Sequence, residues 1–262
     1  MTTTSDTVGD VLRDWRRRRR LSQMDLSGEA DISARHLSFV ESGRAAPSRE
    51  MLMRLAEPLA LPLRERNRLL LAAGYAPCYP ERAFDAPDLD AARQAVEAIL
   101  AAHDPYPALA VDRHWTLVAA NKAVADLLAG VATHLLEPPV NVLRLSLAPD
   151  GLAPSIVNLA EWRRHLLERL RRDAASSGDR RLLDLHDELR AIPVAASTRP
   201  PPRNAAAIAV PLLLRRGEAT LSFLSTTTVF GTATDVTLAE LTLEAFLPAD
   251  QATRDALTAA GR

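Results

Sequence analysis

The sequence predicts a multidomain protein in which an N-terminal bundle of five helices precedes an α+β domain, whose antiparallel sheet is flanked by helices. Apolar residues recur at helical spacing through residues 8–73, prolines cluster directly afterwards, and short alternating apolar runs appear farther along. We therefore expect domains at 1–75 and 104–262, joined by a Pro-rich linker and a connecting helix at 76–103.

Length and composition limit the class of protein. The 262 residues are enough for two domains of ordinary size, and a hydrophobic content of 47 % allows substantial cores. The sequence starts without an apolar signal segment, and no apolar run approaches the length of a transmembrane helix, so we expect a soluble, cytoplasmic protein. A single cysteine, Cys78, cannot form an internal disulfide or supply a cysteine-based metal site.

Charge is unevenly distributed, although the net charge is only −1. Residues 1–75 hold 13 Arg and 10 Asp or Glu, a balance of +3, and six of these arginines lie within residues 11–20. A basic N-terminal domain on an acidic body suggests a division of labour between the domains, but a balance of +3 does not by itself identify a partner.

Capping residues mark the N-terminal helices. Ser22 with Asp25 three residues later forms a capping box, which gives the second helix a defined start. The other helices are expected to begin near Val8, Ser33, Ser48 and Pro62.

The second and third helices are separated by a tight break at Ala30-Asp31-Ile32. The chain there is expected to adopt a left-handed conformation, which glycine accepts most readily and Asp tolerates better than most residues. Leu26, Leu37 and Val40 supply apolar contacts that hold the two helices at a steep angle. This arrangement predicts a helix-turn-helix with an exposed outer face on the third helix.

The residue spacing from Gln23 to Val40 and the trailing sequences ESGRAAPS and LMRLAEPLALP resemble the Cro/repressor-type (XRE) helix-turn-helix family over residues 8–73. Asp31 stands where the family usually has Gly. The resemblance implies a transcriptional regulator that binds a double-stranded DNA operator. For such a module, a symmetric homodimer is expected, because one module contacts too few base pairs for specificity. The alternative is a bundle used only for protein contacts, as in antitoxin-like relatives.

The resemblance assigns roles to individual side chains. Gln23 and Ser33, at the starts of the second and third helices, are expected to contact phosphates. Arg35 is the candidate for bidentate reading of guanine. The remaining candidates are Ala34 and Phe39, against thymine methyl groups, Ser38, a weaker reader, and Arg44, at the DNA backbone.

Two further residues of the motif are expected to be structural. Glu41 resembles the buried acid of the family, which the register pairs with Arg16 of the first helix. His36 stands where the family often has an aromatic residue, so packing is its expected role.

Beyond the linker, helix and strand patterns alternate. Asp88 is the expected N-cap of a helix at 89–102, and two short strands follow, joined by the turn Asp112-Arg113-His114. A segment at 141–147 is expected to be a short helix or strand. Helices are expected at 122–129 and 179–190, and a longer amphipathic helix at 155–172.

Three strands and a short C-terminal helix complete the predicted domain, which then has about five antiparallel strands. The strands are expected at 205–214, 218–229 and 236–247. The last of them alternates, with one side formed by Leu241, Leu243, Ala245 and Leu247.

Three segments of this domain resemble the MmyB-like C-terminal domain of a subgroup of these regulators. They are PALAVDRHWTLVAANKAV (107–124), VLRLSLAPDGLAPSIVNLAEWRRHLL (142–167) and FLSTTTVFGTATDVTLAELTLEAFLPAD (223–250). The resemblance implies a PAS-like fold with an apolar pocket for a fatty acid or fatty-acyl ligand. A small sheet flanked by helices agrees with a mostly apolar cavity, but the residues do not name the ligand.

Candidate ligand-binding residues come from the same segments. Arg144 would suit a carboxylate by bidentate hydrogen bonding. Asn158 and His165 are further polar candidates, with the alternatives that Asn158 satisfies a loop backbone and His165 lies half-exposed. The expected walls are Trp115, Trp162 and Phe223, each of which could equally be plain core.

Enzyme signatures were not found in the sequence. The six histidines show no metal-ligand spacing, and there is no Gly-x-Ser-x-Gly elbow and no Gly-rich phosphate loop. We therefore expect a regulator without catalytic residues, metal or resident cofactor. A haem-type PAS sensor with a histidine as axial ligand is the alternative.

Overall fold

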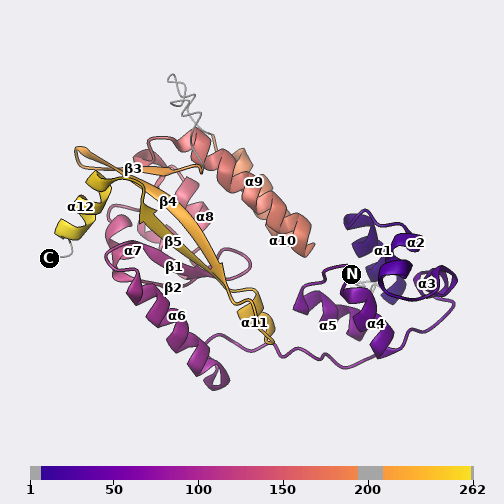
Figure 1. Cartoon of the computed structure of the whole chain (residues 1–262). Coiled ribbons are helices and arrows are strands. Elements are labelled where there is room, and N and C mark those ends of the chain that lie inside the picture. The colour runs from indigo at the N-terminus through magenta and orange to yellow at the C-terminus, as the bar shows by residue number, and fades with distance from the viewer. Residues whose placement is uncertain (1–6, 194–208, 261–262) are drawn as a thin grey trace. The chain divides into compact units, whose positions relative to one another are not determined.

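The computed structural model of the protein describes residues 7–193 and 209–260. The chain forms two compact units (Figure 1). The first contains the residues up to Arg82 together with Thr232–Ala239, and the second contains Ala83–Gly231 and the residues from Glu240 onward. The chain therefore passes from one unit to the other three times.

Five helices lie within residues 7–82, as predicted, and their apolar faces share one core. They are α1 (Val8–Arg18), α2 (Gln23–Glu29), α3 (Ala34–Glu41), α4 (Arg49–Ala56) and α5 (Leu63–Ala72). The side chains of Ser22, Ser33 and Ser48 accept hydrogen bonds from the first turns that follow them, which confirms the predicted helix starts. Each helix contributes at least one fully buried leucine: Leu12, Leu26, Leu37, Leu52 and Leu69.

The break between α2 and α3 depends on Asp31, whose φ of 49° confirms the predicted left-handed conformation. The turn is closed by backbone hydrogen bonds, including Ile32 N to Ser27 O at 2.9 Å. Arg54 on α4 donates to the carbonyl of Ala30 at 2.7 Å, so that the helix behind the motif also holds the turn.

The first unit also contains α11 (Val236–Ala239), which lies between two strands in the sequence. Val236 N donates to Pro80 O at 2.8 Å, and Arg82 pairs with Asp235 at 2.9 Å. The predicted strand over 236–247 was therefore wrong in its first part. Asp235 explains this difference, because its carboxylate accepts from Thr237 N at 2.8 Å and starts a helical turn.

Among its described residues, the second unit is built on a five-stranded antiparallel sheet in the order β2-β1-β5-β4-β3. As predicted, the β1–β2 turn is polar, and the Asp112 carboxylate accepts from the backbone N–H groups of His114 and Thr116. The predicted strand 205–214 lies partly outside the described residues. The strands are β1 (Ala108–Val111), β2 (Leu117–Ala120), β3 (Leu212–Arg216), β4 (Ala219–Val229) and β5 (Thr242–Pro248).

Helices and 3₁₀ turns surround this sheet. Asp88 does not cap the helix that follows it, because Pro87–Leu89 winds into a 3₁₀ turn (η1) and Leu89 occupies the N-cap position. The elements are η1, α6 (Asp90–Ala102), α7 (Lys122–Leu127), η2 (Thr133–Leu135), α8 (Val142–Leu147), η3 (Ala153–Ser155), α9 (Leu159–Ser177), α10 (Arg180–Ala191) and α12 (Gln251–Ala260).

The segment at 141–147, expected to be a short helix or strand, is the helix α8. The helix predicted over 155–172 begins at Leu159 and runs to Ser177, because residues 153–155 form the separate turn η3.

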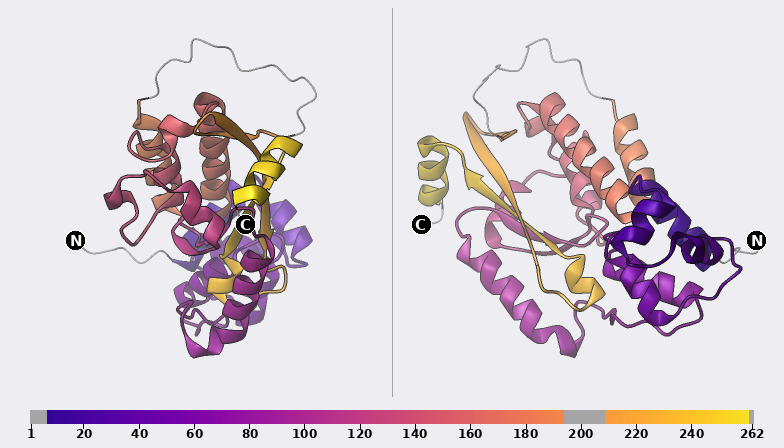
Figure 2. Two further views of the ribbon diagram at one scale, coloured as in Figure 1. Left: turned by 90° about the vertical axis from the view of Figure 1, so that its left-hand side faces the viewer. Right: turned by 45° about the vertical axis from the view of Figure 1, so that its right-hand side comes forward.

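The two faces of the sheet have separate cores. On one face, α6 packs against β1 and β5, and on the other, α8, α9 and α10 form the larger core (Figure 2). Leu241, Leu243 and Ala245 belong to the α6 core, as the predicted alternation requires, whereas Leu247, predicted on the same side, is exposed. Glu244 and Phe246, which alternate with Leu243 and Ala245, therefore face the helices of the larger core.

Candidate functional site

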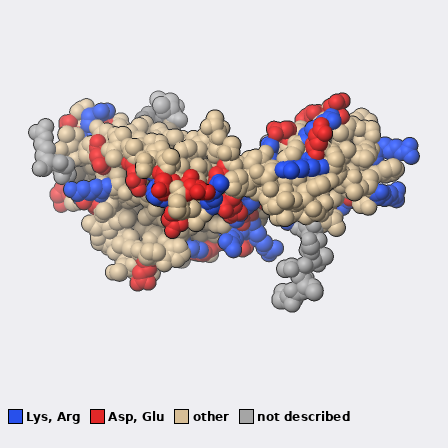
Figure 3. All heavy atoms as spheres, turned by 90° about the horizontal axis from the view of Figure 1, so that it is seen from below, with Lys and Arg blue, Asp and Glu red and all other residues tan. Residues whose placement is uncertain are grey.

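The outer face of α3 carries most of the residues expected to contact DNA. Arg35 and Arg44 are exposed, as is Ser33 at the N-cap, whereas Ala34, Ser38 and Phe39 are half-buried. The Arg35 guanidinium lies 5.4 Å from the centre of the Phe39 ring, so the aromatic ring supports the arginine on the same face. Basic side chains protrude from the surface of the helical unit (Figure 3).

Gln23 is held in place by the buried ion pair between Arg16 and Glu41. Arg16 donates to both oxygens of Glu41, at 2.7 and 2.8 Å, which confirms the predicted pair. Gln23 donates its side-chain amide to the same carboxylate at 2.8 Å. The amide is thereby fixed at the start of α2, and its phosphate contact stays a prediction.

The ionisation of Glu41 depends on these partners, because its side chain is only 2 % exposed. Burial acts to raise the pKa of Glu41, but hydrogen bonds from Arg16 and Gln23 and the nearby positive charges outweigh burial and lower this pKa. The ionised carboxylate therefore stabilises the fold above the unfolded-state pKa of about 4.3, and this contribution is lost as the pH falls through the lowered value.

Replacing Arg16 tests this network. Arg16→Leu should lower the free energy of unfolding of the helical unit by roughly 3 kcal/mol at neutral pH, because it removes the arginine that binds both oxygens of a buried carboxylate and leaves Arg13, at 4.0 Å, as the nearby cation. It should also weaken the loss of stability below about pH 4. Urea unfolding followed by circular dichroism measures both effects.

The control is Arg17→Leu, which removes an exposed arginine from the same helix. It should change the free energy of unfolding by no more than about 0.5 kcal/mol. Equal destabilisation by the two variants would contradict a structural role for the Arg16–Glu41 pair.

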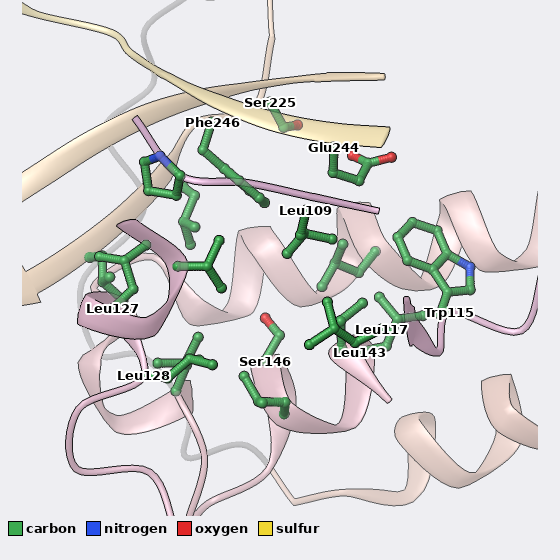
Figure 4. Close-up of a pocket in the computed structure, with 18 of the residues that line it drawn as sticks. Leu109, Trp115, Leu117, Leu127, Leu128, Leu143, Ser146, Ser225, Glu244 and Phe246 are labelled. Carbon is green, nitrogen blue, oxygen red and sulfur yellow. The ribbon is translucent and has the colours of Figure 1, made fainter. Parts of the chain in front are cut away.

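The second unit contains an apolar cavity of about 100 Å³ between the sheet and the helices α7, α8 and α9. The polar side chains among the described lining residues are Ser146, Arg169, Ser225 and Glu244. Glu244 lies near Trp115 on one side of the cavity, and Leu127 and Leu128 lie on the opposite side (Figure 4). The apolar walls include Leu109, Leu117, Leu127, Leu128, Leu143 and Phe246.

Trp115 closes one end of the cavity from a strained backbone position. Its φ is 64°, which is unusual for a bulky residue. The turn around Asp112 holds this conformation, because Trp115 N donates to Asp112 O at 3.0 Å. The strain places the indole ring against the guanidinium of Arg169, whose carbon lies 4.6 Å from the ring centre.

Two of the three aromatic residues predicted as walls line the cavity. Trp115 and Trp162 do so, and the Trp162 indole N–H donates to Ser146 Oγ at 3.2 Å. Phe223 is fully buried behind the wall and meets Phe246 edge to face, with ring centres 6.5 Å apart. Phe223 therefore packs behind the wall residue Phe246 and is itself a core residue, which was the alternative considered for it.

The structure places Arg144 and Asn158 away from the cavity wall. Arg144 donates to both oxygens of Glu188, at 2.6 and 2.7 Å, and this half-exposed pair joins α8 to α10. Asn158 donates to Pro211 O and accepts from Leu213 N, which matches its alternative role of satisfying a loop backbone. Neither side chain is among the described residues that line the cavity.

His165 lies behind the wall formed by Trp162. The two rings are stacked with centres 5.4 Å apart. Burial and the positive charges of Arg169 and Arg172 lower the pKa of His165, which favours its neutral form. No histidine is among the described residues that line the cavity, so the haem-type alternative has no axial ligand there.

Sequence reasoning missed the charged pair of the cavity, Arg169 and Glu244. One available signal was the acid at 244, which interrupts an otherwise apolar strand in LTLEAFLP. The alternation of β5 predicted that the face with Leu243 and Ala245 is buried. The residues that line the cavity, Glu244 and Phe246, are on the opposite face of the strand.

The family comparisons agree with this division of the chain. A family model described as the MmyB-like transcription regulator ligand binding domain matches residues 92–260, which is more than half of the chain. The chain belongs to this family. A second model, for a helix-turn-helix domain, matches residues 7–69. A search of curated proteins found no match.

This MmyB-like protein is therefore a DNA-binding transcription regulator with a ligand-binding domain. The helix-turn-helix match covers the exposed face of α3, and the ligand-binding match covers the cavity. Within the described parts of the chain, no helix combines the length and apolar character needed to cross a membrane.

Proposed function

We propose that the protein binds its operator as a homodimer and that a fatty acid or fatty-acyl molecule in the cavity of the second unit controls it. The observation that carries this proposal is a cavity with almost wholly apolar walls, of which Leu109, Leu117 and Leu143 are examples. Such walls favour a hydrocarbon chain, whose burial is worth about 0.8 kcal/mol per methylene. The PAS-like fold remains part of the proposal, supported by the five-stranded antiparallel sheet.

The first experiment tests base reading by α3. Arg35→Ala should weaken binding to a cognate operator by roughly 1–3 kcal/mol, because a bidentate contact to guanine is lost, and should weaken binding to scrambled DNA much less. Fluorescence anisotropy with both duplexes at one fixed salt concentration measures the difference.

Arg254→Ala is the control, because it removes one exposed arginine from α12, outside the helix-turn-helix. It should leave both affinities unchanged. Unchanged affinity of Arg35→Ala for the cognate operator would contradict base reading by Arg35 and favour the protein-interaction alternative.

Operator binding as a homodimer predicts a defined half-site geometry. Two copies on one face of DNA require half-site centres about 10 base pairs apart, or a multiple of that distance. Light scattering at tens of micromolar should give twice the mass of one chain, both free and on DNA. A monomeric mass in both conditions would refute the homodimer.

Ligand chain length provides the test of the cavity. Affinity and thermal stability should rise with each methylene of a saturated acyl chain until the cavity is full. Leu128→Trp should move the optimum to shorter chains, because the larger side chain occupies space at the wall opposite Trp115. A melting-temperature series across chain lengths, on the parent protein and this variant, measures the shift.

The matched control is Leu183→Trp, which enlarges an exposed leucine on α10. It should leave the optimum where the parent has it. A response that does not depend on chain length in the parent protein would end the fatty-acyl proposal.

A further inference from the structure

The end of the cavity at which Glu244 lies beside Trp115, here called the polar end, has its charge already compensated. Among the described lining residues, Arg169 and Glu244 are the side chains that carry a full charge. Arg169 Nη1 donates to Glu244 Oε2 at 2.9 Å, and Nη2 donates to the other carboxylate oxygen. Thr227 Oγ1 also donates to Glu244, at 3.2 Å. Both terminal nitrogens of the Arg169 guanidinium thus already donate hydrogen bonds to Glu244.

Burial makes this pair difficult to open. The Glu244 side chain is 5 % exposed and that of Arg169 is 18 % exposed. The face of the guanidinium rests on the Trp115 ring. A ligand carboxylate that bound Arg169 in place of Glu244 would leave Glu244 buried without its cation. This is strongly unfavourable in a low-dielectric interior.

The surroundings of the pair also disfavour a further negative charge. Asp173, one turn along α9 from Arg169, has its pKa raised chiefly by burial, and the charge of Glu244 adds to this rise. The positive charges of Arg169 and Arg172 oppose the rise without reversing it. The carboxylate of a bound ligand would be disfavoured by the same two effects, the negative charge of Glu244 and burial away from solvent.

The remaining polar groups of the cavity suit an uncharged head. Ser146 Oγ accepts from the Trp162 indole, so its hydroxyl hydrogen can be donated to a ligand oxygen. Ser225 presents a second hydroxyl near Glu244 (Figure 4). Hydroxyl groups can satisfy the carbonyl of an ester or amide, or an alcohol, without any need for a free cation.

We propose that this cavity selects long-chain molecules with an uncharged head, such as a fatty amide, ester or alcohol, over the free carboxylates of the same chain length. The proposal rests on the acyl-binding function proposed above and specifies its ligand class. The head lies among Ser146, Ser225 and the Arg169–Glu244 pair, and the chain extends toward Leu127 and Leu128. A free fatty acid would enter only after taking up a proton, which costs roughly a few hundredfold in affinity at neutral pH for an aliphatic carboxyl of ordinary pKa.

The test compares lauric acid, lauramide and lauryl alcohol, each below its micelle concentration, by isothermal titration of the full chain at neutral pH. Lauramide and lauryl alcohol should bind more than about tenfold tighter than laurate. Laurate that binds as tightly as lauramide would overturn the uncharged-head proposal and leave the acyl-binding function intact. Failure of all three to bind would instead contradict the acyl-binding function.

A charge variant shows whether the pair is the cause. Glu244→Gln keeps the shape of the side chain and leaves the charge of Arg169 unpaired. Laurate should bind this variant at least about tenfold tighter than the parent, while the affinity for lauramide changes little. An unchanged laurate affinity in the folded variant would overturn the role of the pair.

Glu188→Gln is the matched control, because it breaks a similar bidentate ion pair, the one with Arg144, outside the cavity. It should preserve the order of affinities found for the parent. If Glu244→Gln does not fold, the order of the three ligands on the parent protein still decides the proposal.

Discussion

Glu244 has almost no access to water, and the polar end of the cavity is organised around the compensation of its charge. Arg169 reaches it from α9, across 75 positions of sequence, and thereby ties the long helix to the central strand of the sheet. Trp115 then packs on the guanidinium from a left-handed backbone position. The three residues contact one another through this arginine, and the two opposite charges at this end of the cavity balance each other.

The helical unit uses the same physical device for a different purpose. Glu41 is also buried and paired with an arginine, but its partners come from α1 and α2 of the helical bundle. The pair holds α3 against the two preceding helices while the opposite side of α3 stays exposed. Breaking a buried ion pair of this kind is costly because it leaves an uncompensated charge, although the intact pair adds little net stability over apolar residues of similar volume.

The two units are connected by more than one segment of the chain. Between β4 and β5 the chain enters the first unit, where Asp235 pairs with Arg82, and then returns to form the strand that carries Glu244 and Phe246. The strand that lines the cavity is therefore continuous with a segment of the helical unit. A ligand that binds two arrangements of this strand with different affinity would shift the equilibrium between them.

The sequence by itself determined the elements whose causes are local. The serine caps, the left-handed turn at Asp31 and the alternation of Leu243 and Ala245 depend on residues a few positions apart, and all were predicted. The pairing of Arg16 with Glu41 was also predictable, because the register of a known motif brings them together.

Only the tertiary structure decided which polar side chains meet at the cavity. Arg144 and Arg169 are both arginines near apolar segments, and the sequence favoured Arg144, which instead pairs with Glu188. The choice depends on the rotation and position of α9 against β5, and these are set by packing over the whole core. The start of β5 was missed for a related reason, because contacts of Asp235 and Val236 with distant residues hold a helical turn there.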